Sequence, residues 1–198
     1  MLEADVFEKY GAAKSDARGV HLAIEVSMNL EEAIKVALDY ENKVRDHYAN
    51  GAKSIKDPHG KRVFETLAKE EQGHVDYLDH CLEQWNKAGK VDVTEIGMVV
   101  APGIEWVEKA REELAKRGDK RVADKNEIDL LKIAVKLEEK TSAFYESLVA
   151  ELPADDRQMF DKFLEIEKGH VAIVQAELDS VQGLGFWFDV REFSLEAG

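Results

Sequence analysis

The chain lacks several features that whole classes of protein require. It has a single cysteine among 198 residues, Cys81, which excludes an internal disulfide and a metal site made of paired cysteines. No stretch approaches the ~20 consecutive apolar residues of a membrane-spanning helix. The first residues, MLEADVFEKY, are acidic where a secretory signal has a basic start and an apolar run. We therefore expect a cytoplasmic protein that does not enter a membrane.

Basic residues are also scarce. The chain has 27 Lys and Arg against 41 Asp and Glu, for a formal net charge of −14. With no basic stripe to neutralise phosphate, we expect no binding to nucleic acid or to anionic membrane surfaces. The remaining composition, with 44% hydrophobic residues and three prolines, is typical of a soluble, helix-rich chain. The length predicts one domain over residues 1–198.

Apolar residues recur at helical spacing in four long segments. Asn29 is a suitable N-cap for the first segment, and Pro153 ends the third. Gly51 and Pro58 interrupt the pattern between the first and the second. The expected helices cover about residues 30–50, 61–88, 127–152 and 155–182.

The lengths of the connections predict how these helices pack. Two hairpins with short turns are separated by nearly forty residues, in which about 103–116 looks like an extra short helix. We therefore expect an all-α fold, a four-helix bundle with one long crossover connection. The first 28 residues show no clear helical period, and neither does the aromatic tail 183–198 around Trp187. The tail is an obvious patch for covering the bundle or joining a second subunit, so we expect a homodimer.

Two short motifs each occur twice, about half a chain apart. A Glu followed seven residues later by a Tyr occurs in the first and third helices, and Glu-x-x-His occurs in the second and fourth. Both spacings place the paired residues on one face of a helix. The pairs are Glu41/Tyr48 and Glu138/Tyr145, offset by 97, and Glu71/His74 and Glu167/His170, offset by 96.

The hairpin register brings these residues to one level. The midpoint of Glu41 and Glu71 falls in the first expected turn, and that of Glu138 and Glu167 falls beside Pro153. Packing of the two hairpins would then gather four Glu and two His at the bundle centre. Four unpaired carboxylates cannot be buried together, because desolvation and repulsion oppose their ionisation.

Two divalent metal ions would balance this charge. Carboxylate with imidazole suits iron or manganese, and zinc can occupy such a site in a purified sample. Other glutamates near the chosen ones in the sequence are alternative ligands, namely Glu70, Glu139 and Glu165. Only Glu71, Glu138 and Glu167 preserve both spacings across the repeat.

In these motifs the chain resembles the rubrerythrin and erythrin branch of the ferritin-like di-iron proteins, over residues 30–88 and 127–182. The resemblance implies two iron ions and external electrons. It implies that Glu41 and Glu138 are terminal carboxylates, that Glu71 and Glu167 bridge, and that His74 and His170 are the imidazole ligands. Tyr48 and Tyr145 would be hydrogen-bond partners that orient the carboxylates.

Three features depart from the relatives. Rubrerythrins proper carry a four-cysteine rubredoxin-like site that Cys81 alone cannot form, so electrons would come from another protein. Rubrerythrins also have a further glutamate in the third helix, where this chain has Lys140 and Thr141. Bacterioferritin binds haem through a methionine at the position of Gln72, so no haem is implied here.

The expected function is therefore a di-iron oxidoreductase. It would reduce hydrogen peroxide, or oxidise ferrous iron with peroxide or dioxygen, using an external donor protein. A non-catalytic iron-binding or storage protein and a structural bundle holding zinc remain open, because identical ligands serve all three. Of the other histidines, we expect His47 and His80 at the surface, whereas His21 and His59 lie in irregular sequence.

Overall fold

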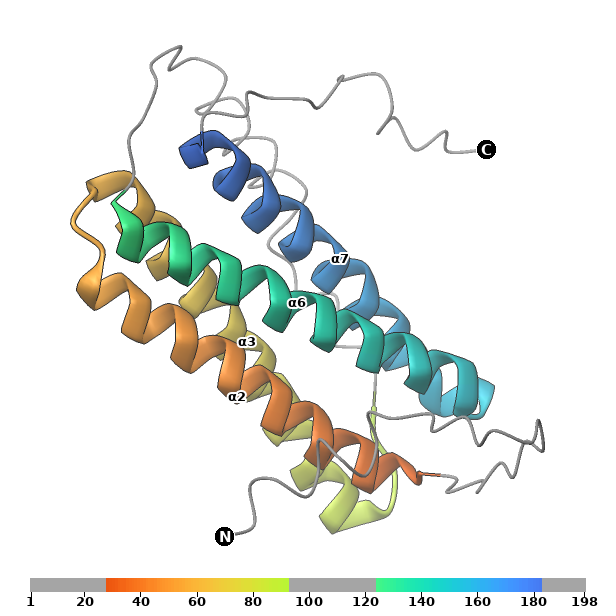
Figure 1. Ribbon diagram of the computed structural model, residues 1–198. Helices are drawn as coiled ribbons and strands as arrows, with labels where there is room; N and C mark the ends of the chain where they lie inside the picture. The colour runs from red at the N-terminus through yellow and green to blue at the C-terminus, as the bar shows by residue number, and fades with distance from the viewer. Residues whose placement is uncertain (1–27, 93–123, 183–198) are drawn as a thin grey trace, which may run out of the picture.

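The computed structural model describes residues 28–92 and 124–182, and all regular structure within them is helical (Figure 1). The expected all-α bundle is confirmed for this part of the chain. Three expected features lie outside the described residues: the short helix at 103–116, the N-terminal segment and the aromatic tail. The four helices are α2 (Leu30–Ser54), α3 (Pro58–Ala88), α6 (Lys125–Glu151) and α7 (Ala154–Gln182).

The start of α2 follows the expected cap. The Asn29 side chain accepts a hydrogen bond from the Glu32 backbone N–H at 2.9 Å, and the Glu32 carboxylate accepts one from the Asn29 N–H at 3.2 Å. This reciprocal capping box satisfies two of the backbone donors that a helix start leaves open. At the end of α3, Gly89 adopts the left-handed conformation, with φ of 66°, which suits glycine.

Two expected boundaries in the first hairpin were wrong. Helix α2 continues through Gly51 to Ser54, and the Ile55 N–H still donates to the Gly51 carbonyl at 3.0 Å. Helix α3 begins at Pro58, whose fixed φ suits a first helical position, with Asp57 as the N-cap. The turn is therefore only three residues long, and the residues expected to break the helices lie inside them.

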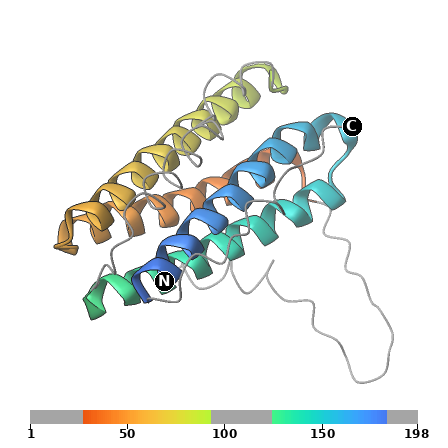
Figure 2. The same cartoon turned by 90° about the horizontal axis from the view of Figure 1, so that it is seen from above.

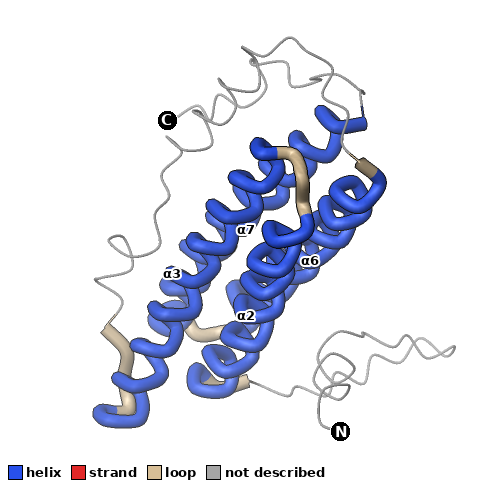
Figure 3. The backbone as a smooth tube through the Cα atoms, turned by 90° about the vertical axis from the view of Figure 1, so that its left-hand side faces the viewer, coloured by secondary structure: helices blue, strands red, loops and turns tan. Residues whose placement is uncertain are grey.

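The helices form two antiparallel hairpins, α2–α3 and α6–α7, and α2 also packs along α6 (Figure 2). The short turns within each hairpin can be followed in Figure 3, where α3 ends at the end of the bundle at which α2 begins. Because neighbours in each hairpin run in opposite directions, the middle of every helix lies at the same level.

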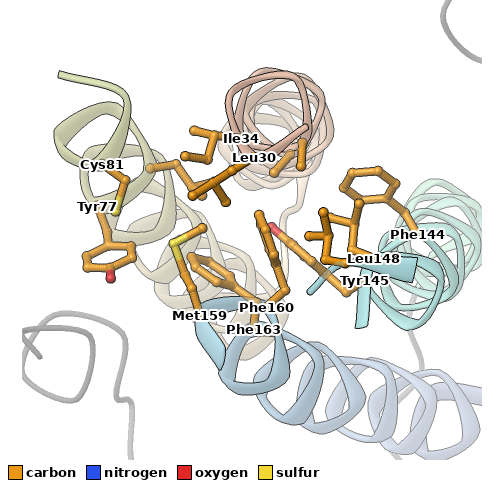
Figure 4. Close-up of a cluster of buried hydrophobic side chains, with 14 residues drawn as sticks. Leu30, Ile34, Tyr77, Cys81, Phe144, Tyr145, Leu148, Met159, Phe160 and Phe163 are labelled. Carbon is orange, nitrogen blue, oxygen red and sulfur yellow. The ribbon is translucent and has the colours of Figure 1, made fainter. Parts of the chain in front are cut away.

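Apolar side chains fill the bundle above and below that level. One cluster gathers Leu30 and Ile34 of α2 with Phe160 and Phe163 of α7, around Tyr145 of α6 (Figure 4). The other cluster lies toward the α2–α3 turn. Its members include Val44, Phe64, Leu67, Leu131 and Val174. The central level is thus enclosed by hydrophobic layers at both ends.

None of the described helices combines the length and the low charge that crossing a membrane would require.

Candidate metal centre

The six residues of the doubled motif lie together at the central level. Each is buried, with 0–2% of its surface exposed. Their potential ligand atoms form two overlapping groups, within each of which all atoms lie within 4.8 Å of one another. Glu71 and Glu167 belong to both groups. The first group is Glu41, Glu71, His74 and Glu167, and the second is Glu71, Glu138, Glu167 and His170.

The imidazoles face the carboxylates through their Nδ1 atoms. His74 Nδ1 lies 3.0 Å from Glu41 Oε2, 3.2 Å from Glu71 Oε2 and 3.4 Å from Glu167 Oε1. His170 Nδ1 lies 2.8 Å from Glu71 Oε1 and 4.0 Å from Glu138 Oε2. The two rings stack, with centroids 5.4 Å apart and planes inclined by 11°. Both His side chains therefore present the same nitrogen to the centre.

The two tyrosines connect the hairpins at the same level. The Tyr48 hydroxyl on α2 donates to Glu138 Oε1 on α6, and the Tyr145 hydroxyl on α6 donates to Glu41 Oε1 on α2. Each tyrosine thus holds the glutamate of the other hairpin, although the spacing in the sequence relates it to the glutamate of its own helix. These bonds hold one oxygen of each carboxylate and leave the other facing the imidazoles.

Burial dominates the ionisation of three of the glutamates. It raises the pKa of Glu41 and of Glu138 to about 7, and in both cases the neighbouring Glu71 adds to the rise. Burial together with the three other carboxylates raises the pKa of Glu167 well above its ordinary value. For Glu71, burial acts in the same direction but is outweighed by His74 and His170, so its pKa is lowered. The protein alone therefore does not stabilise four negative charges here.

The histidines respond in the opposite sense. Burial would lower the pKa of His74, but Glu71 and Glu41 outweigh it and raise this pKa well above the ordinary value. The same balance raises the pKa of His170, with Glu71 as the main carboxylate. Without a metal, the two imidazoles are the cations that the cluster favours.

The polar atoms of the cluster fit a cation as their partner. Among the described residues, both carboxylate oxygens of Glu71 and of Glu167 lack a hydrogen-bond partner, as does Glu138 Oε2. A buried polar atom without a partner costs ~1–3 kcal/mol, and more if it is charged. Carboxylate oxygens and imidazole nitrogens are also the ligands that iron and manganese take. The residues present therefore fit two metal ions, which would balance the carboxylates without a lysine or arginine in the cluster.

The neighbouring acidic residues behave differently. Glu139 and Glu165 are exposed, which supports the register that the repeat selected. Glu70 was not expected at the site, yet its Oε2 lies 3.2 Å from His170 Nε2.

The third-helix positions expected to differ from rubrerythrins carry no carboxylate in this chain. Lys140 is exposed, and the Thr141 hydroxyl donates to the Leu137 carbonyl at 3.0 Å.

Two histidines differ from expectation, since His47 was expected at the surface and His59 in irregular sequence. His47 is half-buried rather than at the surface, with Nε2 3.0 Å from the Leu130 carbonyl of α6, and its burial lowers its pKa. His59 is buried in the first turn of α3, where Nε2 lies 3.6 Å from Glu177 Oε2. His80 is exposed, as expected. Sequence spacing gave no signal for the first two, because their burial comes from contacts with α6 and α7.

The bundle and its buried cluster define a class. The described chain is an all-α, ferritin-like bundle with a carboxylate–histidine cluster that is compatible with a di-iron site. A family model described as Rubrerythrin matches residues 5–82, a segment that includes α2 and most of α3. The chain is thus similar to rubrerythrins over this segment, which confirms the resemblance indicated by the motifs. Searches of curated proteins and of solved structures found no match.

Proposed function

We propose that the protein binds two metal ions at the central cluster and acts as a di-iron oxidoreductase. In this proposal it reduces hydrogen peroxide, or oxidises ferrous iron with peroxide or dioxygen, and receives electrons from an external donor protein. The observation that carries the proposal is the pair of overlapping four-residue groups, which share Glu71 and Glu167. Two sets of ligands with two common carboxylates are what a pair of adjacent ions requires.

The shared residues suggest a division of roles. Glu71 and Glu167 would bridge the two ions, since only they have oxygen atoms in both groups. Glu41 with His74 would complete one position, and Glu138 with His170 the other. Six side chains leave coordination positions open on two ions, and open positions distinguish reactive sites from purely structural ones.

The surrounding residues would hold this arrangement. Tyr48 and Tyr145 fix one oxygen of Glu138 and of Glu41, so that each carboxylate meets the centre with the other. Such partners orient ligands, and their loss typically costs 10–100-fold in metal affinity or activity. The hydrophobic layers on both sides limit the access of bulk water to the centre.

When bound, two ferrous ions would supply two electrons together, which avoids release of a one-electron radical. The chain's own part is to bind the ions, to orient the carboxylates and to exclude water. Manganese fits the same ligands, and zinc would bind without redox chemistry.

The function can be tested with the metal-free full-length protein. It is loaded anaerobically with two equivalents of ferrous iron and mixed with one equivalent of hydrogen peroxide or dioxygen. The near-ultraviolet absorption of ferric iron is followed by stopped flow, and a chemical reductant then starts the next cycle. The H74A/H170A double variant is the control for iron that reacts outside the cluster.

Fast oxidation by peroxide, repeated over many cycles and absent from the double variant, would support the proposed oxidoreductase. Slow oxidation with iron accumulating far beyond two ions per chain would replace it with storage. No change in absorption with either oxidant would contradict both and leave a bundle that holds zinc.

A further inference from the structure

The two halves of the candidate metal centre differ at the outer side of the histidine rings. On the side of His170, the carboxylate of Glu70 lies 3.2 Å from Nε2, the nitrogen that faces away from the centre. Both side chains are largely enclosed, with 2% of the His170 side chain and 12% of the Glu70 side chain exposed. For His74, in contrast, every ion pair with a carboxylate of the described residues is made through Nδ1, at Glu41, Glu71 and Glu167.

The internal repeat explains this difference. The offset of 96 that relates His74 to His170 relates Glu70 to Ile166 and Leu67 to Phe163. Ile166 is partly buried against the hydrophobic cluster, and the Phe163 ring meets the His74 ring edge-on, with centroids 5.3 Å apart. One imidazole therefore has a carboxylate beside its outer nitrogen, whereas its counterpart has the Phe163 ring against it.

We propose that Glu70 is a positioning residue that holds the His170 ring with Nδ1 toward the centre. It thereby makes the His170 position the tighter of the two metal positions. This position is the group of Glu71, Glu138, Glu167 and His170. This inference rests on the proposed two-ion site. A neutral imidazole that binds a metal through Nδ1 carries its proton on Nε2, which here faces Glu70. A carboxylate that accepts a hydrogen bond from this N–H fixes the tautomer and makes the ring a stronger ligand.

The two atoms are at ion-pair distance, but the N–H is not yet aimed at the oxygen as in a hydrogen bond. The proposal therefore concerns the metal-bound protein, in which His170 Nδ1 is occupied and only Nε2 can donate. Because His74 has no corresponding partner, we expect divalent ions to fill the His170 position first.

The test uses Co²⁺ and the full-length chain, with the visible absorption of Co²⁺ as the measure of binding. Glu70→Leu is made in two backgrounds, one with His74→Ala, which leaves the His170 position, and one with His170→Ala. Glu65→Gln, an exposed change on the same helix, is the matched control. Circular dichroism verifies that each variant retains its helices.

We expect Glu70→Leu to weaken Co²⁺ binding ~10–100-fold in the His74→Ala background. In the His170→Ala background it should change binding less than about 2-fold. Glu70→Gln removes the charge but keeps an acceptor oxygen, so it should recover part of the affinity that Glu70→Leu loses. If only the charge of Glu70 mattered, the two substitutions would weaken binding equally. Proton NMR of the Co²⁺ form should show a shifted imidazole N–H signal that moves in Glu70→Leu but not in Glu65→Gln.

Equal weakening in both backgrounds, or none in either, would overturn the role of Glu70 while leaving a two-ion site in place. If the unmodified chain bound fewer than two Co²⁺ ions, the proposed function would fail first, and the two failures are thus distinguishable.

Discussion

The hydroxyl groups of Tyr48 and Tyr145 are the clearest case in which single atoms connect the two hairpins. Each hydroxyl is buried and donates to a glutamate of the opposite hairpin. Burial and the nearby carboxylates raise both tyrosine pKa values well above the ordinary value, so both remain donors throughout the physiological range. The donor side of both bonds is therefore insensitive to pH under ordinary conditions, whereas the accepting carboxylates of Glu41 and Glu138 have pKa values of about 7.

Replacing both tyrosines with phenylalanine removes two oxygen atoms and keeps the rings. We expect Co²⁺ affinity to fall ~10–100-fold, because the terminal carboxylates lose the groups that orient them. Helical content should be unchanged. Tyr40→Phe is the control, since Tyr40 stacks on Phe144 with ring centroids 4.6 Å apart. Unchanged affinity in the double variant would show that the carboxylates are oriented by other contacts.

Cys81 illustrates how burial governs reactivity. The side chain is almost fully buried, and burial raises its pKa from 9.0 to about 11. Since the thiolate is the reactive form, a shift of this size reduces its population near pH 8 by roughly 100-fold. We expect iodoacetamide to modify the native protein at least that much more slowly than the protein unfolded in guanidinium. A native rate equal to the unfolded rate would show that Cys81 is accessible.

The same shift predicts the sign of a pH effect on stability. The folded thiol holds its proton up to about pH 11, whereas the unfolded thiol releases it near 9. Its contribution is therefore complete below about pH 9 and is lost as the pH rises toward 11. The free energy of unfolding should thus fall more steeply above pH 9 than in Cys81→Ala, measured in parallel by denaturant titration.

At the scale of the helices, Gly51 of α2 lies in close contact with α3. A Cβ atom at Gly51 would lie 2.6 Å from Cδ1 and Cε1 of Phe64, a fully buried ring. That ring meets Tyr48 edge-on, with centroids 5.2 Å apart. Gly51 thus permits a close contact that also supports a tyrosine of the candidate metal centre.

We expect Gly51→Ala to lower the free energy of unfolding by ~1–2 kcal/mol, because overpacking outweighs the gain in helix propensity. The midpoint of thermal unfolding should fall by ~2–8 °C. Gly169→Ala is the matched control, since nothing lies within 4 Å of its Cβ position. It should stabilise by ~0.5–1 kcal/mol. Equal effects of the two changes would contradict a steric role for Gly51.

For the molecule as a whole, the buried carboxylates oppose folding unless something balances them. Three of the four have raised pKa values, which shows that their ionised forms are disfavoured in the folded protein. A ligand that binds only the folded state stabilises it by ~2.7 kcal/mol at a hundred times its dissociation constant. Metal loading should therefore have a large effect on this bundle.

We expect saturating Co²⁺ to raise the thermal midpoint of the metal-free protein by at least ~5 °C, as measured by circular dichroism. The H74A/H170A variant should lose most of this gain, because each position keeps only its carboxylates. Ca²⁺, which prefers a cage of oxygen ligands, serves as the control ion. An equal gain in the double variant would place the stabilising ions elsewhere on this acidic chain.

Apolar periodicity predicted the four helices, the connection lengths predicted the two hairpins, and the repeat of Glu-x6-Tyr and Glu-x-x-His predicted the six central residues. This succeeds because helix periodicity and hairpin register are local rules, and both depend only on spacing along the chain. The predicted cap at Asn29 is equally local. The boundaries at Gly51 and Pro58 were wrong for different reasons. Helix α2 continues through Gly51, where it packs against Phe64 of α3, and α3 begins at Pro58 because proline suits a first helical position.

The sequence alone therefore determined the helical class, the pairing of the helices and the buried carboxylates and histidines at the centre. Only the tertiary structure decided which partner each group meets. It directs Tyr48 to Glu138 and Tyr145 to Glu41, brings Glu70 behind His170, and buries His59 beside Glu177. These contacts join residues of different hairpins, and their geometry depends on how the hairpins pack, which no spacing within a helix specifies.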